Sequence, residues 1–145
     1  MIPVFSEDCV ELVKESEGLR LTRYFDPVGI PTIGYGHVVT DDDGDLMAIT
    51  EEKADELLHW DILKAWNIVC RQVTVDLTQG QADALTDFVF NTGGGNLSRS
   101  TLLRLINQRK FNEASEQFER WVFAQDIKLP GLIVRREKER LLFIS

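Results

Sequence analysis

Apolar residues recur every three or four positions along most of the chain, which is the spacing of one face of a helix. A first helix is expected over 7–17, because Ser6 is a suitable N-cap and Gly18 can end the helix. The same spacing predicts five more helices, over about 51–71, 78–91, 99–108, 112–122 and 131–143.

The period changes between residues 19 and 39, where apolar and polar residues mix over short runs. Asp26-Pro27-Val28-Gly29 has the residues that a type I turn prefers, and it joins two short strands. Pro31 predicts an edge position for the second strand, because proline cannot donate a ladder hydrogen bond. Residues 19–39 therefore predict a small antiparallel sheet, in which Gly34 and Gly36 mark a bend or a close approach.

These elements predict a mostly helical α+β fold in one domain over residues 1–145. A small hairpin lobe over about 18–50 is expected to face a helical lobe built from 1–17 and 72–145. The helix over 51–71, about 30 Å long, connects the two lobes. Because the candidate chemistry falls near the hairpin lobe, we expect a cleft between them.

Composition and charge exclude several classes of protein. The chain carries 24 acidic and 16 basic residues, and its net charge of -8 argues against nucleic-acid binding. The charge is uneven, since residues 1–63 hold 15 of the acidic residues but only 4 of the basic ones. No apolar run reaches the roughly 18 residues of a membrane span, and the start of the chain lacks a basic segment. We therefore expect neither a signal peptide nor stable membrane insertion.

Several conspicuous residues have structural explanations. Cys9 and Cys70 lie in apolar stretches and are expected to be buried free thiols. The acidic loop over 41–45 lacks the ligand spacing of a calcium loop and is expected to be a solvated turn, so we predict no metal. The three tryptophans fit the apolar stripes and are expected in the core: Trp60, Trp66 and Trp121.

The candidate chemistry is narrow. The chain has no nucleophile elbow and no phosphate-binding glycine loop, and two histidines are too few for a zinc site. A carboxylate pair remains, formed by Glu17 and Asp26. Together with a hydroxyl group such as that of Thr32, an acid and a base suffice to hydrolyse a glycosidic bond. With 24 acidic residues, however, spacing alone makes this pairing only suggestive.

The predicted elements give the two carboxyl groups different environments. Glu17 ends the first helix, where the partial negative charge of the carbonyl groups disfavours an ionised carboxylate and suits a general acid. Asp26 starts the hairpin turn, where backbone N–H groups can hold a carboxylate ionised. Thr32 follows the turn on the returning strand, within reach of the same pocket.

The spacing of these residues is specific. Asp26 follows Glu17 after eight residues, Thr32 follows after five more, and Ile33-Gly34-Tyr35-Gly36-His37 comes next. This segment resembles the active-site segment of the phage-type lysozymes, glycoside hydrolase family 24. Residues 88–103 and 121–137 also resemble that family, so the resemblance covers nearly the whole chain in order.

The resemblance implies a lysozyme-like fold and a mechanism. Glu17 would protonate the leaving oxygen, while Asp26 would hold or activate the attacking water with help from Thr32. The substrate would be the β-1,4 bond between N-acetylmuramic acid and N-acetylglucosamine in peptidoglycan, cut with inversion and without a cofactor. Inversion needs the two carboxyl groups roughly 6.5–9.5 Å apart, so that water fits between them.

The resemblance extends to residues around the pair. Three residues match positions that line the family's cleft: Val38, Phe90 and Ser100. Phe90 is equally well explained as a core residue. His37 is expected to anchor the sheet to an acidic residue near the long helix. Either Arg135 or Arg136 could bind Glu17 or a substrate carboxylate, or both could form ion pairs along a helix.

The expected partner is the glycan strand of peptidoglycan, met by a monomer that waits in the host cytoplasm until a membrane hole releases it. The sequence pI near 4.7 departs from the basic character of free-acting wall lysozymes. A virion-borne lysozyme or a secreted effector therefore stays open beside a lysis enzyme. Two other functions also stay open, a lytic transglycosylase and a catalytically silent peptidoglycan-binding module, although the complete Glu-Asp-Thr combination favours hydrolysis.

Overall fold

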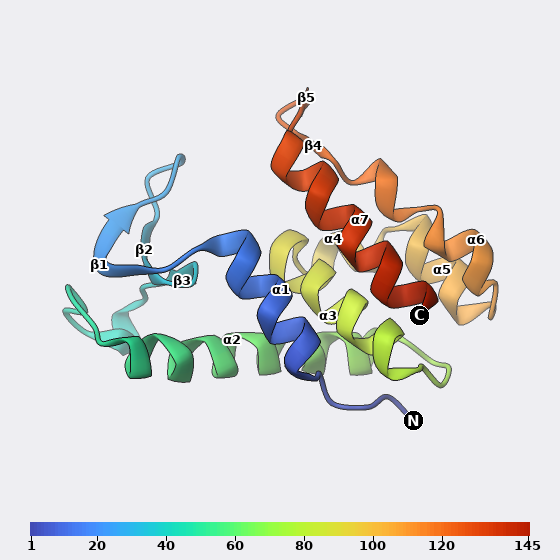
Figure 1. Ribbon diagram of the computed structural model, residues 1–145, viewed down its shortest axis with the longest axis horizontal. Coiled ribbons are helices and arrows are strands. Elements are labelled where there is room, and N and C mark those ends of the chain that lie inside the picture. Colours follow the sequence, from blue (N-terminus) through green and yellow to red (C-terminus); the bar gives the residue numbers. More distant parts are fainter.

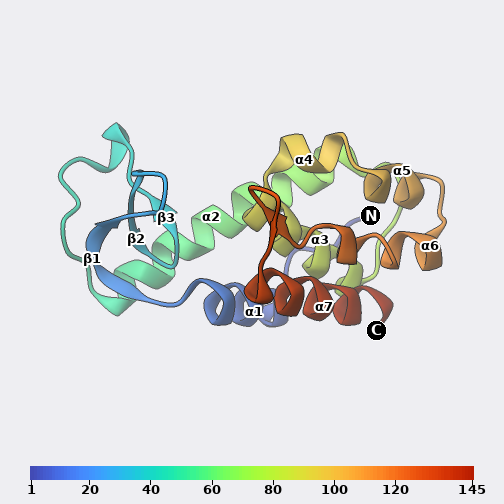
Figure 2. The same ribbon diagram turned by 90° about the horizontal axis from the view of Figure 1, so that it is seen from above.

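The computed structural model describes residues 1–145 and places a small sheet at one end of a long helix, with the other helices packed at the far end (Figure 1). The view from above shows the long helix α2 running between the two parts (Figure 2). The helices are α1 (Glu7–Glu17), α2 (Glu51–Gln72), α3 (Gln79–Thr92), α4 (Gly94–Ser98), α5 (Thr101–Asn107), α6 (Phe111–Ser115) and α7 (Pro130–Ile144). The strands are β1 (Arg20–Phe25), β2 (Pro31–Gly34), β3 (His37–Val38), β4 (Phe123–Ala124) and β5 (Ile127–Lys128), and short 3-10 turns cover η1 (Asp41–Asp43) and η2 (Phe118–Arg120). The predicted fold class, mostly helical α+β, is confirmed.

The sheet is antiparallel throughout, with strand order β1-β2-β3. The predicted turn forms, and the N–H of Gly29 donates to the carbonyl of Asp26 at 2.9 Å. The prediction that Pro31 places its strand at an edge is wrong, because β2 is central. Pro31 is the first residue of that strand, a position that sheets tolerate, and its carbonyl accepts a hydrogen bond from the N–H of Val39 at 2.9 Å.

Helix caps account for where the long helices begin. Thr50 and Thr78 accept hydrogen bonds from backbone N–H groups of the first turns of α2 and α3. Ser6 precedes α1 as expected, but its hydroxyl donates to the Asp83 carboxylate of α3 instead of capping its own helix. The start of α1 is therefore tied to α3.

Helix α2 connects three apolar clusters along its length. Leu57 belongs to the cluster beneath the sheet, Leu58 and Ile62 to the cluster shared with α1, and Ala65 and Val69 to the large cluster among the helices. Burial on one face along the whole helix gives α2 the connecting role expected of it.

Helix α3 lies at the centre of the helical part, packed against α1, α2 and α7. Nine consecutive residues, Gln81–Val89, are buried. Two of them, Asp83 and Asp87, are acidic, and a buried carboxylate must be paired to be tolerated. Asp83 accepts a hydrogen bond from the N–H of Ser6 at 2.7 Å, and Asp87 is paired by α7 as described below.

The region between α6 and α7 differs from the prediction. The helix expected over 112–122 ends at Ser115, and the chain continues into η2 and the hairpin β4-β5. Gln125 and Asp126 form the hairpin turn with φ angles of 51° and 65°. Such turns usually carry asparagine or glycine, so the Gln-Asp pair gave no recognisable hairpin signal.

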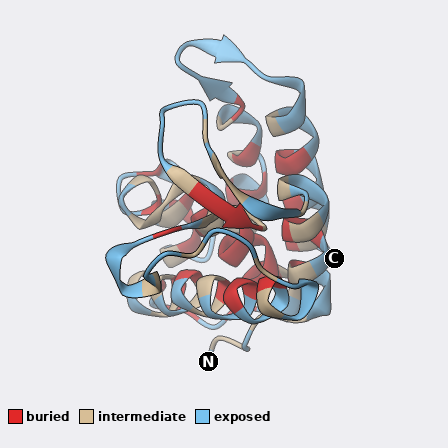
Figure 3. Ribbon diagram, turned by 90° about the vertical axis from the view of Figure 1, so that its left-hand side faces the viewer, coloured by how far each residue is buried: buried red, intermediate tan, exposed pale blue.

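The exposure of the three tryptophans contradicts the predicted core position of one and supports that of the other two in part. Buried residues gather along α3 and the facing sides of its neighbours, while the hairpin tips are exposed (Figure 3). Trp60 is 55% exposed, so its predicted core position is wrong. Trp66 and Trp121 are half-buried, and the Trp121 ring packs edge-on against Phe88. Both cysteines are free, Cys9 buried and Cys70 half-buried.

None of the helices combines the length and the apolar character that crossing a bilayer requires.

Candidate active site

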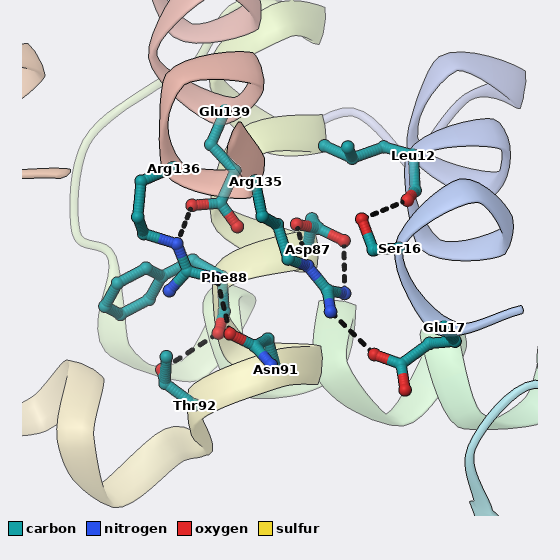
Figure 4. Close-up of polar contacts among 10 residues, drawn as sticks. All are labelled: Leu12, Ser16, Glu17, Asp87, Phe88, Asn91, Thr92, Arg135, Arg136 and Glu139. Carbon is teal, nitrogen blue, oxygen red and sulfur yellow. Dashed lines mark hydrogen bonds and ion pairs between the residues drawn. The ribbon is translucent and has the colours of Figure 1, made fainter. Parts of the chain in front are cut away.

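Glu17 is the last residue of α1, and Gly18 ends the helix with φ of 72°. Its side chain is 24% exposed and points toward α7, where Nη1 of Arg135 donates to Oε2 at 2.6 Å (Figure 4). Arg135, and not Arg136, is therefore the arginine that reaches the predicted acid. An arginine beside a carboxylate stabilises the charged form, which opposes the effect expected from the helix end.

Arg135 is held from the other side by Asp87. Its Nε and Nη2 donate to the two carboxylate oxygens at 2.9 and 2.8 Å, which is a bidentate pair. Burial alone lowers the pKa of the Arg135 guanidinium, but the hydrogen bonds with Asp87 and Glu17 outweigh it and raise the pKa. Arg135 therefore stays charged and joins α3 to the end of α1.

A second arginine and a third carboxyl group lie beside this pair (Figure 4). Arg136 is buried, stacks 5.2 Å from the centre of the Phe88 ring, and donates from Nη2 to the side-chain oxygen of Asn91. Its Nε lies 2.9 Å from Oε1 of Glu139. Burial, together with hydrogen bonding and repulsion from Asp87, raises the pKa of the Glu139 carboxyl group.

Asp26 and Thr32 lie on the β1-β2 hairpin. Oδ1 of Asp26 accepts hydrogen bonds from the N–H groups of Val28 and Ile30, both at 2.9 Å, as expected for a carboxylate at a turn. Thr32 is buried on β2, and its hydroxyl donates to the carbonyl of Ile30 at 2.9 Å. The hydroxyl proton of Thr32 is thus already used, while its oxygen can still accept a hydrogen bond.

Two cavities meet beside Glu17. A cavity of about 420 Å³ lies between the sheet, α2 and α3, and both Val38 and Phe90 line it. A second cavity of about 640 Å³ lies between the end of α1 and the start of α7, and Glu17 and Arg135 line it. Gly36 borders the first cavity, and a Cβ atom on it would lie 2.6 Å from Oε1 of Glu17. Glu17 therefore lies where the two cavities adjoin.

Ser100 lies apart from the other predicted cleft residues. It is buried at the N-cap of α5 and lines a separate cavity of about 270 Å³ with Trp121. Its hydroxyl donates to the carbonyl of Leu97 at 2.7 Å and accepts from the N–H of Leu103 at 3.0 Å. The hydroxyl therefore has a capping role in this structure.

His37 has the structural role expected of it. Its Nδ1 lies 2.7 Å from Oδ2 of Asp61 on α2, and its Nε2 lies 3.0 Å from Oδ2 of Asp43 in η1. Hydrogen bonding with Asp61 and Asp43 raises the pKa of His37 despite partial burial. Backbone hydrogen bonding at Thr40, together with His37, lowers the pKa of Asp43. The histidine thus clamps the sheet and its following loop to α2, forming a wall of the 420 Å³ cavity.

Sequence reasoning missed three members of the site: Asp87, Asn91 and Glu139. Asp87 gave no clear signal in the sequence, because Asp83 and Asp87 are four residues apart and together are typical of a solvated helix face. Glu139 follows Arg136 at a spacing of three, which places both side chains on one face of α7. Asn91 carried no such signal, since asparagine near a helix end is common.

A family model described as phage lysozyme matches residues 14–139.

The chain belongs to the phage lysozyme family.

The similar proteins cover almost the full length of the chain. It is 40% identical over 144 residues to an endolysin of Acyrthosiphon pisum secondary endosymbiont phage 1, covering 97% of each chain. It is 39% identical over 146 residues to the endolysin of Salmonella phage P22, again over 97% of each. A SAR-endolysin of Bacteriophage PS119 is 38% identical over 127 residues, which cover 86% of this chain and 74% of that one.

Solved structures give the same fold. A P22 lysozyme mutant superposes with a TM-score of 0.87 and 37% identity, covering 99% of each chain. The muramidase domain of SpmX from Asticaccaulis excentricus superposes with a TM-score of 0.89 and 35% identity, covering 100% of this chain and 99% of that one. The lysozyme-like fold and the recognised family are thus confirmed, and membership makes the chain a glycoside hydrolase with peptidoglycan as its substrate.

Gly36 gives a test of how closely Glu17 is held. In Gly36→Ala, the new methyl group collides with Glu17, so we expect the rate of wall degradation to fall about 100-fold. Gly44→Ala is the matched control, because Gly44 has a similar φ of 66° and open space around its Cβ position. Both substitutions place alanine at a positive φ, so each should lower the free energy of unfolding by about 1 kcal/mol, which thermal unfolding measures. Equal rates in the two variants would contradict the assigned contact.

The His37 clamp makes stability depend on pH. Because the folded protein raises the pKa of His37, the clamp contributes fully below the unfolded pKa of about 6.5 and is lost as pH rises through the folded value. His37→Asn should therefore lower the free energy of unfolding by about 1–3 kcal/mol at about pH 5.5, and by much less at about pH 9.

Denaturant unfolding of both proteins at the two pH values measures this difference. His59→Asn is the control, since His59 lies on α2 beside the rings of Phe5 and Trp60 and has no carboxylate partner. A loss in His37→Asn that is the same at both pH values would show that the charge of the histidine contributes nothing.

Proposed function

We propose that this chain is a muramidase that hydrolyses the β-1,4 bond between N-acetylmuramic acid and N-acetylglucosamine, with Glu17 as the general acid. The observation that carries the proposal is the position of Glu17 between two cavities, held by Arg135 on one side and by the close approach of Gly36 on the other. A glycan strand could then occupy both cavities and place one glycosidic oxygen beside this carboxyl group.

Asp26 and Thr32 supply the other half of the reaction. Oδ1 of Asp26 accepts hydrogen bonds from two backbone N–H groups, which leaves Oδ2 for a water molecule. Because the Thr32 hydroxyl already donates its proton to Ile30, its oxygen is available to accept a hydrogen bond from the same water. A base and an acceptor on one hairpin can thus orient the attacking water.

Hydrolysis by Glu17 and Asp26 consumes one water molecule. Water attacks the anomeric carbon and gives one proton to Asp26, while Glu17 gives its proton to the leaving oxygen of the next sugar. The bond between the anomeric carbon and that oxygen breaks, and attack from the opposite face inverts the anomeric centre. Proton exchange with solvent then restores both carboxyl groups.

Binding is expected to rely on short-range contacts. With a net charge of -8 the protein has no general attraction to an anionic wall. Val38 and Phe90 offer apolar surface to sugar rings in the 420 Å³ cavity, and we propose both as substrate-binding residues. Ser100, which is buried beside Trp121 in a separate cavity, remains a predicted third substrate-binding residue.

Glu17→Gln tests the acid. It removes the proton donor but keeps the shape of the side chain, so we expect clearing of permeabilised Gram-negative cells to fall by about 100-fold to 10,000-fold with little change in melting temperature. Glu11→Gln is the matched control, because Glu11 is an exposed residue of α1 that lines neither cavity. Clearing that survives in Glu17→Gln would contradict the proposal.

The products separate hydrolysis from the alternatives. Mass spectrometry of muropeptides released by the unchanged protein should show reducing ends that carry the added water. Products with a 1,6-anhydro ring would indicate a lytic transglycosylase. Binding to walls with no released product would indicate a catalytically silent module.

We also propose that the enzyme accumulates in the host cytoplasm and acts in host lysis once the membrane is opened. The phage endolysins among its relatives support a role in lysis. In a Gram-negative host that expresses the chain, turbidity should hold steady until chloroform opens the membrane, and should then fall within minutes. Lysis before chloroform is added would contradict this route.

A further inference from the structure

The groups around Glu17 form one charged cluster that spans three helices. Arg135 and Arg136 contribute two positive charges from α7, while Glu17, Asp87 and Glu139 contribute three carboxyl groups from α1, α3 and α7. All but Glu17 are at least 95% buried.

The contact with Arg135 creates a difficulty for a general acid. A cation 2.6 Å from Glu17 favours the carboxylate, whereas the acid must carry a proton when substrate is bound. The guanidinium is not free, however, because two of its N–H groups bind both oxygens of Asp87. Glu17 therefore faces an ion pair, not an isolated cation.

We propose that Asp87 is a positioning residue for the reaction: its buried carboxylate orients Arg135 and offsets its charge, so that Glu17 gives up its proton less readily than it would beside an unpaired arginine. This inference rests on the proposed role of Glu17. Asp87 is fully buried and does not touch the cavities, so it acts only through Arg135.

Glu139 supports Asp87 as the ionised partner. Neither oxygen of Glu139 accepts a well-aligned hydrogen bond, although the side chain is completely buried. A protonated Glu139 that donates to Asp87 accounts for this arrangement, and burial and Asp87 both raise the pKa of Glu139. Asp87 then carries the negative charge that Arg135 requires.

The other groups that face the cluster are few. From α1 the thiol of Cys9 faces it, and burial followed by repulsion from Asp87 raises the pKa of that thiol, so it stays neutral. From α3, Asp83 lies one turn before Asp87 and is bound to Ser6. At the open side, Lys138 pairs with Glu15 along the rim of the 640 Å³ cavity. Asp87 is the group that binds Arg135 directly.

Asp87→Asn tests the proposal, because it keeps the shape of the side chain and removes its charge. Without Asp87, the charge of Arg135 should hold Glu17 ionised. The alkaline limb of the pH profile of kcat/KM should therefore move to lower pH by roughly one unit or more. The rate at the acidic plateau should be retained. Thermal unfolding confirms that the variant is folded, and Asp87→Ser replaces it if Asp87→Asn does not fold.

Three matched variants separate charge from structure. Asp83→Asn removes a buried charge from the same helix and should leave the limb in place. Glu139→Gln substitutes a neutral group for one already protonated and should also leave the limb in place. The double variant Asp87→Asn with Arg135→Gln removes both charges and should return the limb toward its original pH, which a merely structural loss could not do.

A titration without substrate keeps this test independent of the proposed function. In 13C-labelled protein, the Glu17 carboxyl signal, assigned by its absence in Glu17→Gln, should titrate at lower pH in Asp87→Asn than in the unchanged protein. The same midpoint in both proteins, or an equal shift in Asp83→Asn or Glu139→Gln, would overturn the inference. An active Glu17→Gln would instead overturn the proposed function and leave the titration result standing.

Discussion

The buried ion pair between Arg135 and Asp87 links the core of the helical part to the cleft. Asp87 lies in the middle of a helix that is buried on every side, so its charge must be met by a cation from a neighbouring element. The guanidinium of Arg135 donates two N–H groups to the Asp87 carboxylate and a third to Glu17. Arg135 is fixed by α3 and in turn fixes the carboxyl group of Glu17 at the end of α1. This carboxyl group lies where the two cavities adjoin.

Much of this arrangement could be predicted because it follows from local signals. Helix caps, the apolar spacing of α2 and the turn residues Asp26 to Gly29 fix where elements begin, end and reverse. The spacing from Glu17 to His37 indicated the family, and the role of His37 as an anchor followed from it. Such features depend on residues near one another in the sequence.

The parts that escaped prediction depend on residues far apart or on weak local signals. Asp87 and Arg135 are separated by 48 positions, and only packing of α3 against α7 shows that they meet. The choice between Arg135 and Arg136 needed the rotation of α7, which apolar spacing leaves uncertain by one residue. Proline is usually confined to edge strands, but the first residue of a strand is an exception, and Pro31 is such a residue. The β4-β5 turn uses residues that are uncommon in hairpin turns.

A crystal structure of Glu17→Gln soaked with a tetrasaccharide of alternating N-acetylglucosamine and N-acetylmuramic acid tests the role of Glu17 most directly. We expect sugars in both cavities, with one glycosidic oxygen about 3 Å from the amide of residue 17 and Arg135 still bound to Asp87. A tetrasaccharide bound with every glycosidic oxygen out of reach of residue 17 would contradict the assignment of Glu17 as the general acid.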